Sequence, residues 1–465
     1  MSEESAKGRY SAPEGSRTWE YLAAFSCSIA ALCLGCIVGW NSPSSVKLTA
    51  PDSPIAVTVS QISTMAALVA VGHMLAPPIS GAVVDRIGRK NTLLLSGLPL
   101  VLSWSMIIVA RSVAVLYVAR FLSGITLGGT VCVCPMYLGE IASVKLRGAV
   151  GAAVSFMFNL GIFFAFLVGP YLSVPALSSV FLGISVAFVV SFWFMPESPY
   201  YLAMVGRVEE AEEALEKLRG KSDVTEELES ITSSSKDKGK SRERVGMKEL
   251  FAIRGNRKAL LILLIFVSTH HFGGYFSIIT YGQLIFREMG DLVPDHLATI
   301  AMAGTQLVGS VLTTFLVERT GRKPLIFCSG FLCAICTFLV GMFFYARDYM
   351  ERDVSPYASI PFVATIVYVF AFTPGLVSVQ LILASEVFVT DVKALGTCIL
   401  GVVGGVLGTV GVKLYVLLAV KWGFGHSVPF LGFSVILTLC TVLLMRLAPE
   451  TKGKTLVQIQ KELNE

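Results

Sequence analysis

The chain has 465 residues, of which 54% are hydrophobic and only 15% are charged, and its mean hydropathy is +0.71. Soluble domains carry about a quarter charged residues, so this composition excludes an ordinary soluble protein and indicates a chain embedded mostly in lipid. The formal net charge of +5 is too small to indicate a nucleic-acid partner.

Twelve mostly apolar runs follow one another along the chain, each close to the ~20 residues that an α-helix needs to cross a bilayer. Backbone groups must stay hydrogen-bonded in lipid, and the runs lack the alternation of barrel strands, so each is predicted to be a transmembrane helix. Six runs precede a long polar segment, at about 19–40, 60–83, 91–110, 114–138, 149–171 and 176–195. Six follow it, at about 258–283, 296–317, 323–345, 360–388, 395–420 and 427–447.

These runs divide the chain into five segments. They are an N-terminal tail (1–18), a six-helix bundle (19–195), a linker with short helices (196–257), a second six-helix bundle (258–447) and a C-terminal tail (448–465). Within the linker, the polar, low-complexity stretch Ser233–Arg244 is predicted to be disordered. Lys and Arg concentrate in the short loops on the side of the two tails, which predicts that both termini are cytosolic. The plasma membrane is the expected location.

Three motifs occur twice, at equivalent places in the two bundles. They are "DRIGRK" (Asp85–Lys90) with "ERTGRK" (Glu318–Lys323), "EIASVKLRG" (Glu140–Gly148) with "EVFVTDVKALG" (Glu386–Gly396), and "PESP" (Pro196–Pro199) with "PETKGKTL" (Pro449–Leu456). One duplicated six-helix unit explains all three pairs. The predicted fold is therefore an all-α membrane protein with two pseudo-symmetric six-helix bundles, an arrangement typical of alternating-access transporters.

The repeated charges suggest a gate. A network of exposed ion pairs, each contributing about 0–1 kcal/mol, can hold the cytosolic ends of the bundles together without locking them. Its predicted members are Asp85, Arg89, Glu140, Arg147, Glu197, Glu318, Arg322, Glu386, Lys393 and Glu450. The alternative is that these loops are simply basic flanks that fix orientation. The repeated acids argue against it, because orientation makes little use of Asp or Glu.

Taken together, the motifs resemble the sugar-porter branch of the major facilitator superfamily. The likeness spans nearly the whole chain and rests on the motifs above together with "RFLSG" (Arg120–Gly124) and "PMYLGEIASVKLRGAVGA" (Pro135–Ala152). Within the glucose-facilitator family, the chain is closest in character to the insect trehalose facilitators. The resemblance implies the major facilitator fold, sugar transport by alternating access, and a role for Arg120 in the helix-4 motif.

The resemblance also implies which positions hold the sugar. The family's helix-5 Gln corresponds to Ser155, with Asn159 one turn further on. The helix-7 Gln-Gln pair corresponds to His270-His271, and the later helix-7 Asn to Phe276. The helix-8 Asn corresponds to Gln306, which keeps an amide.

Helices 10 and 11 depart furthest from the family pattern. The helix-10 Trp corresponds to Leu381, preceded by Gln380, and the helix-11 Asn-Trp pair corresponds to Gly404-Gly405. The loss of two Trp rings predicts an enlarged cavity with weak, loosely selective binding. The predicted substrate-binding residues are Ser155, Asn159, His270, His271, Phe276, Gln306 and Gln380.

Amide and imidazole groups both donate and accept hydrogen bonds, as a hydroxyl-rich solute requires. Ser155, Ser310 and Thr313 have an alternative role, because hydroxyls readily bond back to their own helix. His270-His271 are better candidates for the transport path, since ionisable groups at membrane depth are rare and usually line a cavity.

No carboxylate is predicted at membrane depth, and no acid in the middle of helix 1 can pair with Arg120. Proton symport usually requires such a carboxylate, so the sequence predicts passive facilitation of a hexose or a trehalose-like disaccharide. It predicts no metal site, no cofactor and no enzymatic activity. The expected partners are the sugar and membrane lipid, not nucleic acid, and the expected functional unit is a monomer. A facilitator of another small polar solute and a non-transporting nutrient sensor remain as alternatives.

Overall fold

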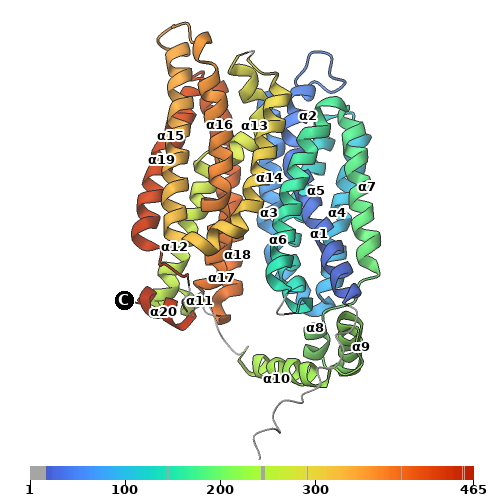
Figure 1. Ribbon diagram of the computed structural model, residues 1–465. Coiled ribbons are helices and arrows are strands. Elements are labelled where there is room, and N and C mark those ends of the chain that lie inside the picture. Colours follow the sequence, from blue (N-terminus) through green and yellow to red (C-terminus); the bar gives the residue numbers. More distant parts are fainter. Residues whose placement is uncertain are drawn as a thin grey trace, which may run out of the picture.

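The structure is a computed structural model that describes residues 17–143, 146–241, 247–290, 292–388, 390–452, 454 and 456–464. These residues form helices and connecting loops, without a β-strand among them. The long helices form two bundles that lie side by side (Figure 1).

The first bundle contains six membrane passes. Its first pass consists of α1 (Thr18–Gly39) and α2 (Asn41–Leu48), which meet at Trp40. The others are α3 (Val59–Ile87), α4 (Arg89–Ile108), α5 (Val113–Ile141), α6 (Arg147–Val168) and α7 (Val174–Trp193).

The second bundle repeats this plan. Its first pass is again divided, into α12 (Arg254–Phe272) and α13 (Tyr275–Glu288). It continues with α14 (Asp295–Thr320), α15 (Arg322–Asp348), α16 (Ser359–Phe372), the π-helix η3 (Thr373–Ser378), α17 (Val379–Glu386), α18 (Thr390–Val416), the π-helix η4 (Leu417–Lys421) and α19 (Ser427–Leu447).

The predicted fold class and the count of twelve passes are confirmed. Among the described residues, eleven segments are long and apolar enough to cross a membrane, and α14 supplies the twelfth pass, packed between α6 and α16. The sequence predicted 258–283 as one helix, whereas the structure divides it at Gly273-Gly274.

Short helices connect the bundles and end the chain. The linker contains α8 (Pro199–Met204), α9 (Val208–Arg219), α10 (Thr225–Ser241) and α11 (Met247–Ala252), and α20 (Leu456–Asn464) follows the last pass. The prediction of disorder from Ser233 onward is corrected in part, because α10 continues to Ser241; residues 242–244 lie outside the described part. Burial of Leu228 and Ile231 fixes the first turns of α10, from which the helix extends.

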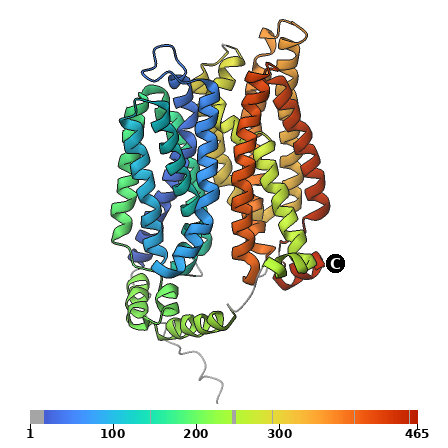
Figure 2. The same ribbon diagram turned by 180° about the vertical axis from the view of Figure 1, so that it is seen from behind.

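These short helices lie at one end of the bundles, here termed the linker face; the opposite end is the far face (Figures 1 and 2). Helix α9 is fixed to the first bundle, since Arg219 pairs with buried Glu20 at 3.5 Å and donates to the Ile141 carbonyl at 2.9 Å. Helix α20 is fixed to the second bundle, because the side chain of Asn464 accepts from the Gly255 N–H at 2.7 Å.

The repeated motifs build the same structure at the linker face of each bundle. Gly88 has a φ of +95° and Gly321 a φ of +90°, in the region that favours glycine. Each glycine starts a helix whose first N–H groups bind a Glu from the end of the same bundle. Glu197 accepts from the N–H groups of Arg89 and Lys90, both at 3.0 Å.

In the second bundle, Glu450 accepts from the N–H groups of Arg322 and Lys323, both at 3.0 Å. A Cβ on Gly321 would lie 3.0 Å from Glu450 Oε2, so the glycine also leaves room for the carboxylate. An anion at a helix N-terminus is favoured by the unpaired N–H groups and the helix dipole. The repeated glycine therefore serves a helix cap supplied by the repeated "PES" and "PET" acids.

The repeated ion pairs lie beside these caps. Arg89 pairs with Glu140 at 2.9 Å, and Arg322 pairs with Glu386 at 2.8 Å. Arg89 also contacts Asp85 at 3.4 Å. Ser198 donates to Glu140, and Thr451 donates to Glu386, so the match extends to the residue after each capping Glu.

These pairs join helices within one bundle, a role that the sequence did not predict. Closure across the bundles stays a prediction for a different conformation, and the side chains of Arg147, Glu318 and Lys393 lie outside the described residues.

The pKa values of the two capping acids are shifted in opposite directions. Burial raises the pKa of Glu197, against the opposing effect of its N–H donors and Arg89. Burial also raises the pKa of Glu450, but it is outweighed by the N–H groups of Arg322, Lys323 and Lys452 and by the Arg322 charge, so that pKa is lowered. A falling pH therefore protonates the cap of the first bundle before that of the second.

Candidate functional site

The break between α12 and α13 organises the candidate site. Helix α12 ends one residue after His270-His271, and α13 begins at Tyr275. Tyr368 of α16 donates to the freed Gly273 carbonyl at 2.8 Å, which ties the break to the fourth pass of the same bundle. Divided helices at mid-membrane expose backbone and side-chain polar groups, and transporters commonly use them for binding.

Gln306 of α14 joins the two bundles at this level. It is 1% exposed. Its Nε2 donates to Asn159 Oδ1 of α6 at 2.7 Å and to the Tyr275 hydroxyl at 2.8 Å. Asn159 in turn donates to the Ser155 carbonyl at 2.8 Å. The structure thus brings Asn159 and Gln306 into contact across the bundles, while the sequence placed them on facing sides of one site.

Aromatic rings surround this network. Tyr275 stacks on Phe372 with ring centroids 4.8 Å apart and 11° between the planes. His270 lies against both, at 5.9 Å from Tyr275 and 5.4 Å from Phe372. The sequence did not identify Tyr275 or Phe372. The signal for Tyr275 was the Gly-Gly pair before it, which breaks the helix and points the next aromatic residue into the bundle.

His271 forms the other edge of the site. Its ring stacks on Phe276 at 4.7 Å and 15°. The same ring faces glycines of α18, because a Cβ on Gly408 would lie 3.0 Å from His271 Cε1 and one on Gly404 would lie 3.8 Å from Nε2. Phe276 therefore supplies an aromatic face in the site, although that face is covered by His271 in this conformation.

Four buried polar atoms of predicted site residues have no hydrogen-bond partner within the described part of the chain. They are His270 Nε2, His271 Nδ1, Gln306 Oε1 and Gln380 Oε1. An unpaired buried polar atom costs about 1–3 kcal/mol, so native proteins retain such atoms mainly where water or a ligand completes them. Their chemistry is neutral: two amide carbonyls that accept, and two imidazole nitrogens that donate or accept according to tautomer.

The other polar residues and the positions of the lost Trp rings lie as follows. Ser310 and Thr313 donate to carbonyls of their own helix, which is the alternative role considered for them from the sequence. Leu381, where the family has Trp, is 63% exposed. Gly405 does not enlarge a cavity in this conformation, because α3 fills its place: a Cβ there would lie 2.5 Å from Met74 Cβ.

The bundles meet along two seams. One joins α6 to α14 and contains the Asn159–Gln306 bond (Figure 1). The other joins α3 to α18, which lie side by side in Figure 2.

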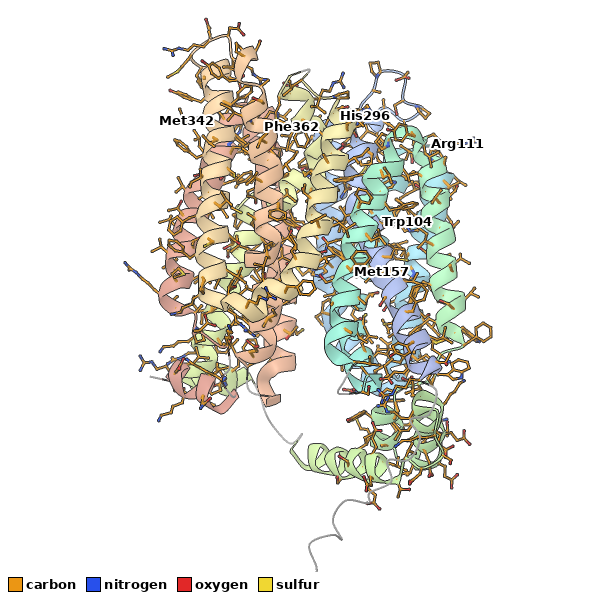
Figure 3. The ribbon with its side chains drawn as sticks, in the orientation of Figure 1. Trp104, Arg111, Met157, His296, Met342 and Phe362 are labelled. Carbon is orange, nitrogen blue, oxygen red and sulfur yellow. The ribbon has the colours of Figure 1, made fainter. Side chains whose placement is uncertain are left out.

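At the far face itself, Gln283 N–H donates to Ser42 Oγ at 3.0 Å, and the rings of Tyr171 and His296 lie with their centroids 6.0 Å apart. His296 lies at this end of the molecule in Figure 3. The described contacts thus close the far face.

Arg120 lies inside the first bundle, fully buried. Its Nη2 donates to the Ile37 carbonyl at 3.0 Å and to Asn41 Oδ1 at 3.1 Å, and its guanidinium lies 4.8 Å from the Trp40 ring centroid. These partners are neutral. Among the described residues, no carboxylate pairs with Arg120.

Known proteins share this sequence pattern and architecture. The family model "Sugar (and other) transporter" matches residues 11–463. The facilitated trehalose transporter Tret1 of Apis mellifera ligustica is 28% identical over 448 residues, covering 96% of this chain and 88% of that protein. Trehalose transporter 1 of Drosophila melanogaster is 27% identical over 96% of this chain but only 52% of its own length. The chain thus spans about half the length of several insect relatives.

Solved structures agree with the fold. The proton:xylose symporter XylE bound to 6-bromo-6-deoxy-D-glucose has a TM-score of 0.75 at 20% identity, covering 96% of this chain and 99% of that one. The E. coli XylE in an inward-open conformation has a TM-score of 0.76 at 18% identity, covering 95% and 99%. Because the family model matches almost the entire chain, this protein belongs to the sugar (and other) transporter family.

Proposed function

We propose that this protein carries a neutral sugar, a hexose or a trehalose-like disaccharide, across a membrane by alternating access and without ion coupling. Family membership and the insect trehalose-transporter relatives support the solute class. The observation that carries the proposal furthest is the position of Gln306, whose amide bonds to the other bundle while its carbonyl oxygen stays unpaired.

The site chemistry favours a solute that donates hydrogen bonds and carries no charge. Gln306 Oε1 and Gln380 Oε1 both require donors, and a sugar hydroxyl supplies one while still accepting from an imidazole N–H. Phe276 carries an aromatic face on which a sugar ring would stack once His271 moves off it.

Substrate binding at Gln306 also couples to movement of the bundles. A hydroxyl that binds its amide N–H competes with Asn159, and so weakens a bond that holds the bundles together at mid-membrane. Binding energy is thereby directed toward the rearrangement that a carrier needs.

The partners of Arg120 support transport without ion coupling, with His270 and His271 as the alternative proton-carrying groups. A coupled proton requires a group at membrane depth that gains and loses it, and carboxylates serve this purpose most often. Arg120 instead binds the Ile37 carbonyl, Asn41 and the Trp40 ring, none of which titrates.

We further infer that the linker face is cytosolic and that the protein acts as a monomer in the plasma membrane. Lys and Arg are concentrated in the short loops on that side. With the far face closed, the conformation described here would then present its site to the cytosol. Transport of this kind involves no chemical reaction of the solute, so we expect no enzymatic activity.

The test is uptake of radiolabelled D-glucose and trehalose into liposomes containing the purified protein. The expected result is saturable uptake that stops at the external concentration and is unchanged by an imposed proton gradient. Protein carrying both Gln306→Leu and His271→Leu is the matched control. Absence of uptake for every neutral sugar tested, or accumulation driven by the gradient, would overturn the proposal.

A further inference from the structure

A lysine lies within the membrane at the seam between the bundles. Lys413 belongs to α18, two turns before the end of the membrane span Leu395–Lys421. Its Nζ donates to Thr64 Oγ1 of α3, in the other bundle, at 2.5 Å. The Thr64 hydroxyl donates its own hydrogen to the Ser60 carbonyl at 3.0 Å, so its oxygen is free to accept from the lysine.

Lys413 is the outermost residue of a regular stripe. Gly405, Thr409 and Lys413 follow one another at four-residue spacing and therefore share one face of α18. Each meets α3 in turn: a Cβ on Gly405 would lie 2.8 Å from the Ala70 carbonyl, and Thr409 Oγ1 lies 3.5 Å from the Ala67 carbonyl. The stripe is the contact surface that must part if the far face is to open.

The stripe leads directly to the candidate site. Gly408, one residue before Thr409, faces the His271 ring, since a Cβ there would lie 3.0 Å from His271 Cε1. Lys413 lies five residues further along α18, or about 7.5 Å along the helix axis. A solute that enters from the far face along this seam would therefore pass the ammonium shortly before reaching His271.

The charge of Lys413 has no counter-ion among the residues that the structure describes. Within the described residues its one hydrogen-bond partner is Thr64, and no carboxylate lies in ion-pair distance of it. A membrane-embedded cation is costly and is usually retained for function. Packing alone does not require one here, since an apolar side chain of similar length would fill the same position between two helices.

We propose that Lys413 is a specificity-determining residue that selects against cationic solutes at the far-face entrance. The inference rests on the proposed sugar transport, because it concerns the route to the same site. When the seam opens, the bond to Thr64 breaks and the ammonium lines the route. A protonated amine on the solute is then repelled in surroundings of low dielectric, whereas a neutral sugar donates or accepts a hydrogen bond as Thr64 did.

The experiment compares a neutral sugar with its amino analogue in liposomes, using D-glucose with D-glucosamine, or trehalose with trehalosamine. Assays run at pH 6, where an aliphatic amine is protonated. In Lys413→Met, the ratio of kcat/KM for the amino sugar to that for the neutral sugar should rise on the order of tenfold. Lys413→Arg keeps the charge and should keep the original ratio.

Two further variants separate charge from other causes. Thr64→Val removes the hydrogen bond but keeps the ammonium, so it should leave the ratio unchanged even if it alters the rate. Lys421→Met removes an exposed cation at the far-face end of the same span, eight residues beyond Lys413, and controls for surface charge.

The outcomes are distinguishable from failure of the transport proposal. If the unmodified protein carries neither neutral sugar, the proposed function fails. If it carries one, and Lys413→Met leaves the ratio within twofold or Lys421→Met raises it equally, Lys413 does not determine specificity and the inference is wrong.

Discussion

Replacing Gly405 by Ala should shift the protein away from the conformation in which the far face is closed, here termed far-closed. A Cβ at this position would lie 2.5 Å from Met74 Cβ and 2.8 Å from the Ala70 carbonyl, whereas ordinary Cβ contacts begin at 3.4 Å. The helices must therefore separate by about 3.4 − 2.5 = 0.9 Å. Neither neighbour is the flexible end of a side chain, so neither can move aside without its backbone.

The size of the effect follows from the cost of overpacking. Inserting one methyl group into a close-packed contact typically costs about 1–3 kcal/mol. The seam is closed in one conformation and open in the other, so this cost falls on the far-closed state alone. The ratio of far-open to far-closed protein should rise by about 5- to 150-fold.

The assay is labelling from the far side by a membrane-impermeant maleimide, at a cysteine introduced at Ala67 on the seam. The protein used for labelling has the exposed native Cys328 replaced, so that this cysteine does not react. Gly405→Ala should raise the labelling rate by the factor above. Gly432→Ala is the matched control, because a Cβ there meets nothing within 4 Å. A rate in Gly405→Ala within twofold of that in the control would show that the seam does not open where we place it.

Three further outcomes are expected. Gln306→Leu removes a hydroxyl partner worth about 1–3 kcal/mol, so sugar affinity should fall roughly tenfold to a hundredfold while the amount of folded protein persists; equal affinity would place the site elsewhere. Arg89→Ala and Arg322→Ala should each lower transport, with substrate binding in detergent retained; normal transport by both at normal abundance would refute a role in gating. Clamping the internal and external pH at different values should leave the sugar distribution at equilibrium unchanged, and a steady gradient of sugar would refute passive transport.

The sequence alone determined the broad architecture. Twelve apolar runs of membrane-spanning length leave an α-helical membrane protein as the available fold, since lipid offers no partner for unpaired backbone groups. The three motif pairs revealed the duplication, because charged loops at equivalent positions survive as patterns along the chain. The same motifs carried the family resemblance.

The role of those motifs was decided by the tertiary structure. The caps on Gly88 and Gly321 exist because the end of the sixth pass lies beside the start of the third, more than a hundred residues away in the chain. Sequence reasoning placed Glu197 and Glu450 in a gate between bundles. It had no means of finding a helix N-terminus as their nearest partner.

The sequence predicted which residues belong to the site, but not which of them contact one another. Asn159 and Gln306 were identified from the family pattern, yet their direct bond, and the part of Tyr275 in it, depend on how α6, α13 and α14 pack.

The glycines of α18 show the limit most clearly. In the sequence, Gly405 is a lost Trp and predicts empty space; in the structure, the missing side chain lets the backbone of α3 approach. A residue without a side chain specifies no partner along the chain, so only the packing of distant helices decides whether it leaves a cavity or closes a seam.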